Sequence, residues 1–121
     1  MPEEYTSLVT ALKALTQGEK SNVITLPMAE NEWNTRPDAE SYGTVALDFE
    51  VDALYGDNKK TVTSYSGSVD LFSRLKDGGG WVEEIVKTLT EYCEGAWSLN
   101  SHMYERENKI FHWEWAFEVE G

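Results

Sequence analysis

The feature that most constrains the fold is the alternation of apolar and polar residues that runs from Gly43 to Arg74. In the first half the apolar positions are Val45, Leu47, Phe49 and Val51. A period of two residues is typical of a β-strand with one buried face. After a polar turn at 55–60 the alternation resumes, and it ends in the motif SVDLF at 68–72. We therefore predict one long β-hairpin over 43–74.

Two segments have the apolar spacing of helices. The first runs from Tyr5 to Leu15, with Gly18 as a plausible stop, and the second runs from Trp81 to Cys93. The second follows the glycine-rich break at 77–80, and Gly95 fits its C-terminal cap.

The remaining strands are predicted on either side of these elements. A short strand at 23–26 is ended by Pro27, and no regular period fits the segment 28–41. A second hairpin spans 97–119 around a charged turn at 105–109, and its last strand alternates large apolar residues with polar ones.

These elements predict an α+β fold in the order α-β-β-β-α-β-β. We expect a two-layer sandwich, in which a mainly antiparallel sheet of four to five strands carries both helices on one face. A chain of 121 residues is the size of one domain, so we expect residues 1–121 to form a single domain without a linker.

The charge balance limits the classes of partner. The chain has 22 acidic and 10 basic residues, for a net charge of −12. Binding to a phosphate backbone needs clustered basic residues, so we expect no specific binding to nucleic acid. The apolar runs are too short to span a bilayer, and the start of the chain lacks the basic region of a signal peptide. We therefore expect a soluble protein without a membrane partner, intracellular when it is made.

Carboxylates concentrate on the polar side of the predicted strands. They are Asp48, Glu50, Asp52, Asp70, Glu114 and Glu118. One interpretation is a solvated face that keeps the domain soluble. The other is a surface that lines a channel or meets a partner in an assembly. Acid–base catalysis would need a pocket that raises the pKa of one carboxyl group, and the sequence indicates none. The candidate assembly surface consists of Asp48, Glu50, Asp52, Asp57, Lys59, Lys60 and Asp70.

The sequence predicts no catalytic residue, no metal site and no cofactor. The single cysteine, Cys93, is expected to be an inert thiol in the core. His102 and His112 fall on the two strands of one predicted hairpin, and without a third ligand we expect two ordinary surface histidines. The segments 37–38 and 57–59 match the acid, acid and lysine pattern of many metal-dependent nucleases, but the second half falls on a turn.

Trp33 differs from the other tryptophans because it falls in the irregular segment 28–41. An aromatic residue in such a segment either fastens the loop to the core or waits for a partner. Together with Arg36 and Tyr42 it forms a candidate partner-contact loop.

Three parts of the chain together resemble a family of small phage proteins. They are the hairpin with its ending at 68–72, the Trp33, Arg36-Pro37 and Tyr42 segment, and the closing strand IFHWEW at 110–115. The combination is similar to the tail-terminator and tail-completion proteins of long-tailed phages and prophages. The resemblance covers nearly the whole chain.

The resemblance implies a non-enzymatic structural protein of the virion. Such proteins assemble as a ring, commonly a hexamer, that caps the tail tube and joins it to the neck. The implied partners are other copies of the chain, the tail-tube proteins and the neck proteins. The implied location is the tail or neck of the virion, after assembly in the host cytoplasm. The hairpin 43–74 would then form the framework of the subunit contacts, and its acidic face would line the DNA channel or meet a basic neighbour.

Two other functions remain open from the sequence. One is a stand-alone module that binds a peptide or a small ligand through Trp33 and its neighbours. The other is a metal-dependent nuclease that uses the 37–38 and 57–59 pattern.

Overall fold

The computed structural model describes residues 3–54 and 60–120, and it describes no side chains for residues 20, 49–54 and 60–63. Along the chain the elements are α1 (Glu3–Lys13), β1 (Thr16–Gln17), η1 (Lys20–Asn22), β2 (Ile24–Thr25), β3 (Met28–Glu30), β4 (Ser41–Leu54), β5 (Lys60–Ser73), η2 (Gly78–Gly80), α2 (Trp81–Tyr92), β6 (Trp97–Glu105) and β7 (Ile110–Glu120).

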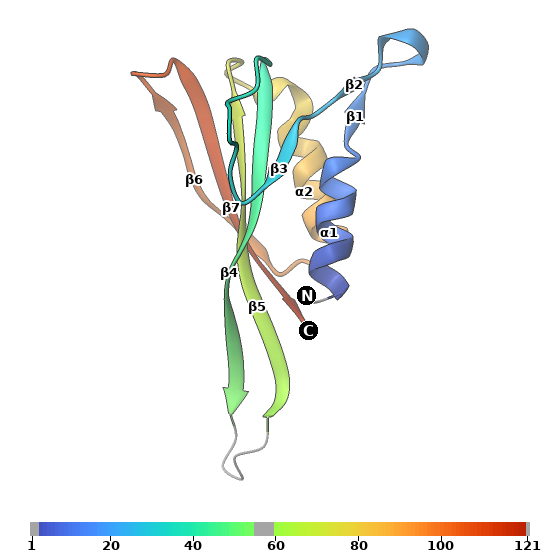
Figure 1. Cartoon of the computed structure of the whole chain (residues 1–121), viewed down its shortest axis with the longest axis vertical. Helices are drawn as coiled ribbons and strands as arrows, with labels where there is room; N and C mark the ends of the chain where they lie inside the picture. The colour runs from blue at the N-terminus through green and yellow to red at the C-terminus, as the bar shows by residue number, and fades with distance from the viewer. Residues whose placement is uncertain (1–2, 55–59, 121) are drawn as a thin grey trace.

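The main sheet has five strands in the order β3-β4-β5-β7-β6. β3 runs parallel to β4, and every other neighbouring pair is antiparallel. Both helices lie on the same side of this sheet (Figure 1). The predicted α+β fold, with two helices over a mainly antiparallel sheet, is therefore confirmed.

The core lies between the helices and one face of the sheet. The helices contribute buried residues at a spacing of three and four, as in Leu8 and Leu12 of α1 and Ile85 and Leu89 of α2. Every second residue of β7 from Trp113 to Val119 is buried against them. The apolar alternation of the last strand therefore faces the helices.

The short strand predicted at 23–26 is present as β2, but its pairing and the segment that follows it differ from the prediction. Ile24–Thr25 pairs with Thr16–Gln17 in a separate two-stranded sheet, and Ile24 is 64% exposed. Met28–Glu30, predicted to be irregular, forms β3 and pairs with Gly43–Val45 of β4. Three residues are too few to show a period of two, and parallel pairing with a later strand leaves no signal in the local sequence.

The long hairpin is present, but its alternation is interrupted. Leu47 lies opposite Gly67 and Phe49 lies opposite Ser66, so Asp48 is the additional residue of a β-bulge. The prediction of one unbroken alternation from Val45 to Val51 was wrong at this point. A second bulge interrupts β6 between Leu99 and Ser101.

The β4–β5 hairpin is longer than the rest of the sheet. β7 pairs with β5 only from Ser64 to Ser73, and β3 pairs with β4 only as far as Val45. The distal part of the hairpin therefore projects beyond both helices (Figure 1). Within the described residues, nothing pairs with the outer edge of β4 after Val45.

Candidate functional site

The candidate site lies on the open face, which we define as the face of the main sheet opposite the helices. Tyr42 of β4, Phe72 of β5 and His112 of β7 are direct neighbours across this face. The Tyr42 and Phe72 rings stack with their centroids 5.1 Å apart, and the Phe72 and His112 rings stack at 4.2 Å. A continuous row of rings therefore crosses three strands.

The segment between β3 and β4 folds over one end of this row. The indole nitrogen of Trp33 donates a hydrogen bond of 3.0 Å to the carbonyl of Gly43. The Trp33 ring meets Tyr42 edge-on at 6.5 Å. Tyr42 is only 6% exposed although it points away from the helices. Trp33 therefore fastens the segment to the sheet, while its own side chain stays partly accessible.

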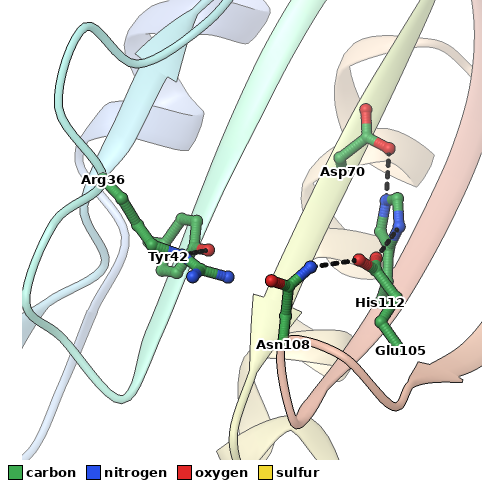
Figure 2. Close-up of polar contacts among 6 residues, drawn as sticks. All are labelled: Arg36, Tyr42, Asp70, Glu105, Asn108 and His112. Carbon is green, nitrogen blue, oxygen red and sulfur yellow. Dashed lines mark hydrogen bonds and ion pairs between the residues drawn. The ribbon is translucent and has the colours of Figure 1, made fainter.

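Arg36 is held above the ring of Tyr42. Its Nε donates a hydrogen bond of 2.6 Å to the Tyr42 hydroxyl oxygen, and its guanidinium carbon lies 5.8 Å from the ring centroid (Figure 2). The side chain is exposed. The structure thus brings together Trp33, Arg36 and Tyr42, the three residues predicted from the sequence to form a partner-contact loop.

These residues border a hollow of about 430 Å³. Its aromatic wall consists of Trp33, Tyr42 and Phe72, and its polar lining includes Arg36, Thr44 and Asp70. The hollow is open to solvent, so it can receive a side chain that projects from a larger partner.

Beyond the hollow, His112 forms a clamp with two carboxylates. Its Nε2 lies 2.7 Å from Oδ1 of Asp70 on β5, and its Nδ1 lies 2.9 Å from Oε2 of Glu105 on β6 (Figure 2). Glu105 also accepts a hydrogen bond of 3.1 Å from the side chain of Asn108. We call His112, Asp70 and Glu105 the histidine clamp, because together they connect three strands.

The clamp favours the charged imidazolium. The hydrogen bond with Asp70 is the main factor that raises the pKa of His112 above its ordinary value of 6.5, and burial opposes this increase. The charges of Asp70 and Glu105 and the hydrogen bond to Glu105 raise the pKa further. Both ring nitrogens can donate only when the ring carries two protons. The geometry therefore suits a structural cation better than a general base.

The clamp corrects the expectation of two ordinary surface histidines. His112 is largely enclosed, with its side chain 21% exposed. His102 lies opposite Trp113 and stacks on that ring at 4.4 Å. His112 lies opposite Met103 and directly precedes Trp113 on β7, so the two histidines lie on opposite faces of the sheet. The sequence does place Asp70 and His112 on the polar sides of their strands, but it gives no sign of which strands pair.

The candidate assembly surface is only partly described. Asp48 is exposed at the bulge, whereas Asp70 belongs to the histidine clamp. Glu50, Asp52 and Lys60 lie in β4 and β5, and their side chains are outside the description. Asp57 and Lys59 lie outside the described residues altogether.

The two carboxylates predicted on β7 have separate places on the open face. Glu114 lies opposite Asp70, and Glu118 lies opposite Ser66 and is exposed. Asp48 and Glu118 both border a second hollow of about 430 Å³.

The nuclease pattern cannot be assembled from the described residues, because its second half is at 57–59. In its first half, Asp38 lies 4.0 Å from Arg74 in an exposed ion pair. Across the described part of the chain, no group of three or more His, Cys, Asp or Glu side chains could hold a metal ion.

Cys93 lies at the end of α2 and is 3% exposed. Burial is the main factor that raises the pKa of its thiol to about 12, and the nearby Glu4 adds to the effect. A thiol reacts with disulfide reagents through its thiolate, so we expect native Cys93 to react at least about a hundredfold more slowly than the urea-unfolded chain. Labelling with 5,5′-dithiobis(2-nitrobenzoic acid) measures both rates. Rapid labelling of the native protein would contradict the buried position.

The sequence matches no protein-family model and no curated protein. Of the helices that the structure describes, none combines the length and the apolar character that a membrane crossing needs.

Proposed function

We propose that the chain is a non-enzymatic structural subunit of a phage or prophage tail. In this proposal, copies of the chain form a ring at the end of the tail tube and join the tube to the neck. The chain resembles tail-terminator and tail-completion proteins in its order of elements and in the ending of its long hairpin.

The observation that carries the proposal is a pair of free edges on the main sheet. β4 after Val45 and the whole of β6 have no strand on their outer sides within the described residues. Among the side chains that the structure describes, six large apolar ones are exposed, and three of these lie on β6, namely Leu99, Met103 and Tyr104. An edge strand with exposed apolar residues favours pairing with another chain.

The directions of the two edge strands suit pairing between identical copies. Three antiparallel steps separate β4 from β6, so these strands run in opposite directions. When a second copy is placed beside the first in the same orientation, β6 of one copy meets β4 of the other in antiparallel fashion. A head-to-tail contact of this kind closes into a ring when the rotation between copies closes.

Native mass spectrometry and light scattering test this proposal across micromolar to millimolar concentrations. We expect closed oligomers of the 13.8 kDa chain, with six copies as the leading species. Leu99→Lys should abolish them, because a lysine on an edge strand opposes pairing. Leu99 is 50% exposed, so the fold should tolerate the change.

Ile24→Lys is the matched control for Leu99→Lys. Ile24 is 64% exposed and lies in the separate two-stranded sheet, so this variant should assemble like the wild type. A wild-type chain that stays monomeric at millimolar concentration would contradict the ring. Assembly that survives Leu99→Lys would contradict the proposed edge.

The hollow beside Trp33 favours a second candidate function, a module that binds a segment of a partner protein. The wall of the hollow is already fixed by the hydrogen bonds of Trp33 and Arg36. A preformed aromatic surface loses little conformational entropy when it binds. This function predicts a monomer that binds a partner through the hollow.

A further inference from the structure

We propose that the hollow beside Trp33 binds a carboxylate that lies next to an aromatic side chain on a partner polypeptide. The carboxylate pairs with Arg36, and the aromatic ring packs against the wall formed by Trp33, Tyr42 and Phe72. This inference deepens the second candidate function and does not depend on ring assembly.

Arg36 is held in place beside the hollow with part of its guanidinium group unused. The chain has more than twice as many acidic residues as basic ones, yet this arginine is held by a tyrosine hydroxyl and not by a carboxylate. Only its Nε is used in that bond. Among the described residues, no hydrogen bond or ion pair involves its two terminal nitrogens. A guanidinium group fixed at Nε presents these nitrogens as a pair, which suits a planar carboxylate.

The wall of the hollow next to Arg36 is aromatic. The stacked rings of Tyr42 and Phe72 and the edge-on ring of Trp33 give the hollow an apolar surface beside the arginine. Tyr42 is held from two sides, by the stack and by the bond from Arg36. The site therefore offers one fixed cation next to one fixed apolar surface.

The other charges around the hollow do not favour a cation. Asp70 also lines the hollow, but its Oδ1 is already engaged by His112 at 2.7 Å. Glu32 lies at the rim and is exposed, so water screens its charge. A cationic ligand would in addition have to approach the positive charge of Arg36, whose guanidinium carbon lies 5.8 Å from the centre of the Tyr42 ring.

The openness of the hollow favours a side chain of a larger partner over a free small molecule. Small-molecule sites usually enclose most of their ligand, whereas this hollow is exposed to solvent. The net charge of −12 also repels a free anion. A polypeptide supplies further contacts outside the hollow, which a small anion does not.

A pair of capped dipeptides tests the proposal with the full chain. Acetyl-Asp-Phe-amide carries the carboxylate and the ring, and acetyl-Asn-Phe-amide differs only by lacking the charge. NMR titration follows the indole N–H signal of Trp33, which is identified from its loss in Trp33→Phe. We expect the Asp peptide to shift this signal and to bind about tenfold more tightly than the Asn peptide. The reason is that a hydrogen bond between Arg36 and a charged carboxylate is stronger than one between Arg36 and a neutral amide.

Variants of the chain assign the effect to Arg36. Arg36→Gln should remove the preference for the Asp peptide, and Arg36→Lys should keep only part of it because lysine lacks the planar fork. Arg74→Gln is the matched control, since Arg74 is exposed and pairs with Asp38 away from the lining of the hollow. Glu32→Gln should change binding of the Asp peptide little, because water screens the charge of the exposed Glu32.

Three results would overturn the proposal. The first is equal binding of the Asp and Asn peptides, which includes the case in which neither binds. The second is a preference for the Asp peptide that survives Arg36→Gln. The third is binding of acetyl-Lys-Phe-amide that is tighter than binding of the Asp peptide and that is lost in Glu32→Gln. None of these results bears on ring assembly, which is measured separately through Leu99→Lys.

Discussion

Replacing Gly67 with valine should destabilise the folded chain by about 3 kcal/mol or more, the upper range for overpacking in a core. Gly67 lies opposite Leu47 on β4 and Phe117 on β7. A Cβ atom at this position would lie 2.4 Å from the backbone oxygen of Ala46 and 2.4 Å from the ring of Phe117. The Phe117 ring could move aside, but the backbone oxygen of Ala46 belongs to the β4–β5 strand pair and cannot move without distorting that pairing.

Urea unfolding followed by circular dichroism measures this effect. Ser68→Val is the matched control, because Ser68 is the next residue of β5 and lies on the open face opposite Ala46 and Ala116. Valine favours strands, so the control should unfold within about 1 kcal/mol of the wild type. A Gly67→Val chain as stable as the control would contradict the close packing of Phe117 over the strand.

Replacing His112 with glutamine should destabilise the chain by about 2 kcal/mol below pH 6.5, where the imidazolium predominates in the folded chain because its pKa is raised above that value. The substitution removes a cation that bonds to two carboxylates, and hydrogen bonds to charged groups are among the stronger polar contacts. Asp70 and Glu105 would then share a largely enclosed site without a positive partner, with side chains 18% and 28% exposed.

The histidine clamp also predicts the direction of a pH dependence. The pKa of His112 is raised in the folded chain above the ordinary value of 6.5. Below that value both states bind the proton, and the stabilisation is fully present. As the pH rises through the folded-state pKa the stabilisation is lost, with a slope of at most about 1.4 kcal/mol per pH unit between the two pKa values.

Unfolding free energies measured from pH 5.5 to pH 9 test this dependence. The wild type should lose stability above pH 6.5, and His112→Gln should lack that component. His102→Gln is the control, because His102 lies on the other face and stacks on Trp113. An identical pH profile in the wild type and His112→Gln would show that the clamp contributes no charge-dependent stability.

Much of the fold could be predicted because the relevant patterns are local. Val69 and Leu71 on β5 and Trp113 and Trp115 on β7 are buried, as their alternation indicated. The two helices likewise bury the residues that recur at a spacing of three and four. In these elements one face is apolar and the other polar, so burial follows from the sequence.

The candidate site was harder to predict because it depends on pairing between distant segments. Asp70 and His112 are 42 residues apart, and they meet only because β5 and β7 pair in one particular register. The bulge after Leu99 then sets the register of β6 from Ser101 to Glu105, which places Glu105 on the clamp. A shift of one residue in either pairing would move these side chains to opposite faces of the sheet.

By itself, the amino-acid sequence determined the α+β class, the long hairpin and the helix-facing residues, since each depends on periods within a single element. Only the tertiary structure decided that Asp48 and Asn100 interrupt the alternation, that Met28–Glu30 joins the sheet, and that His112 is clamped between two carboxylates. It also placed Trp33 and Arg36 against Tyr42. The physical reason is that strand order and register minimise the free energy of the whole domain, whereas the period of a strand is a property of its own residues.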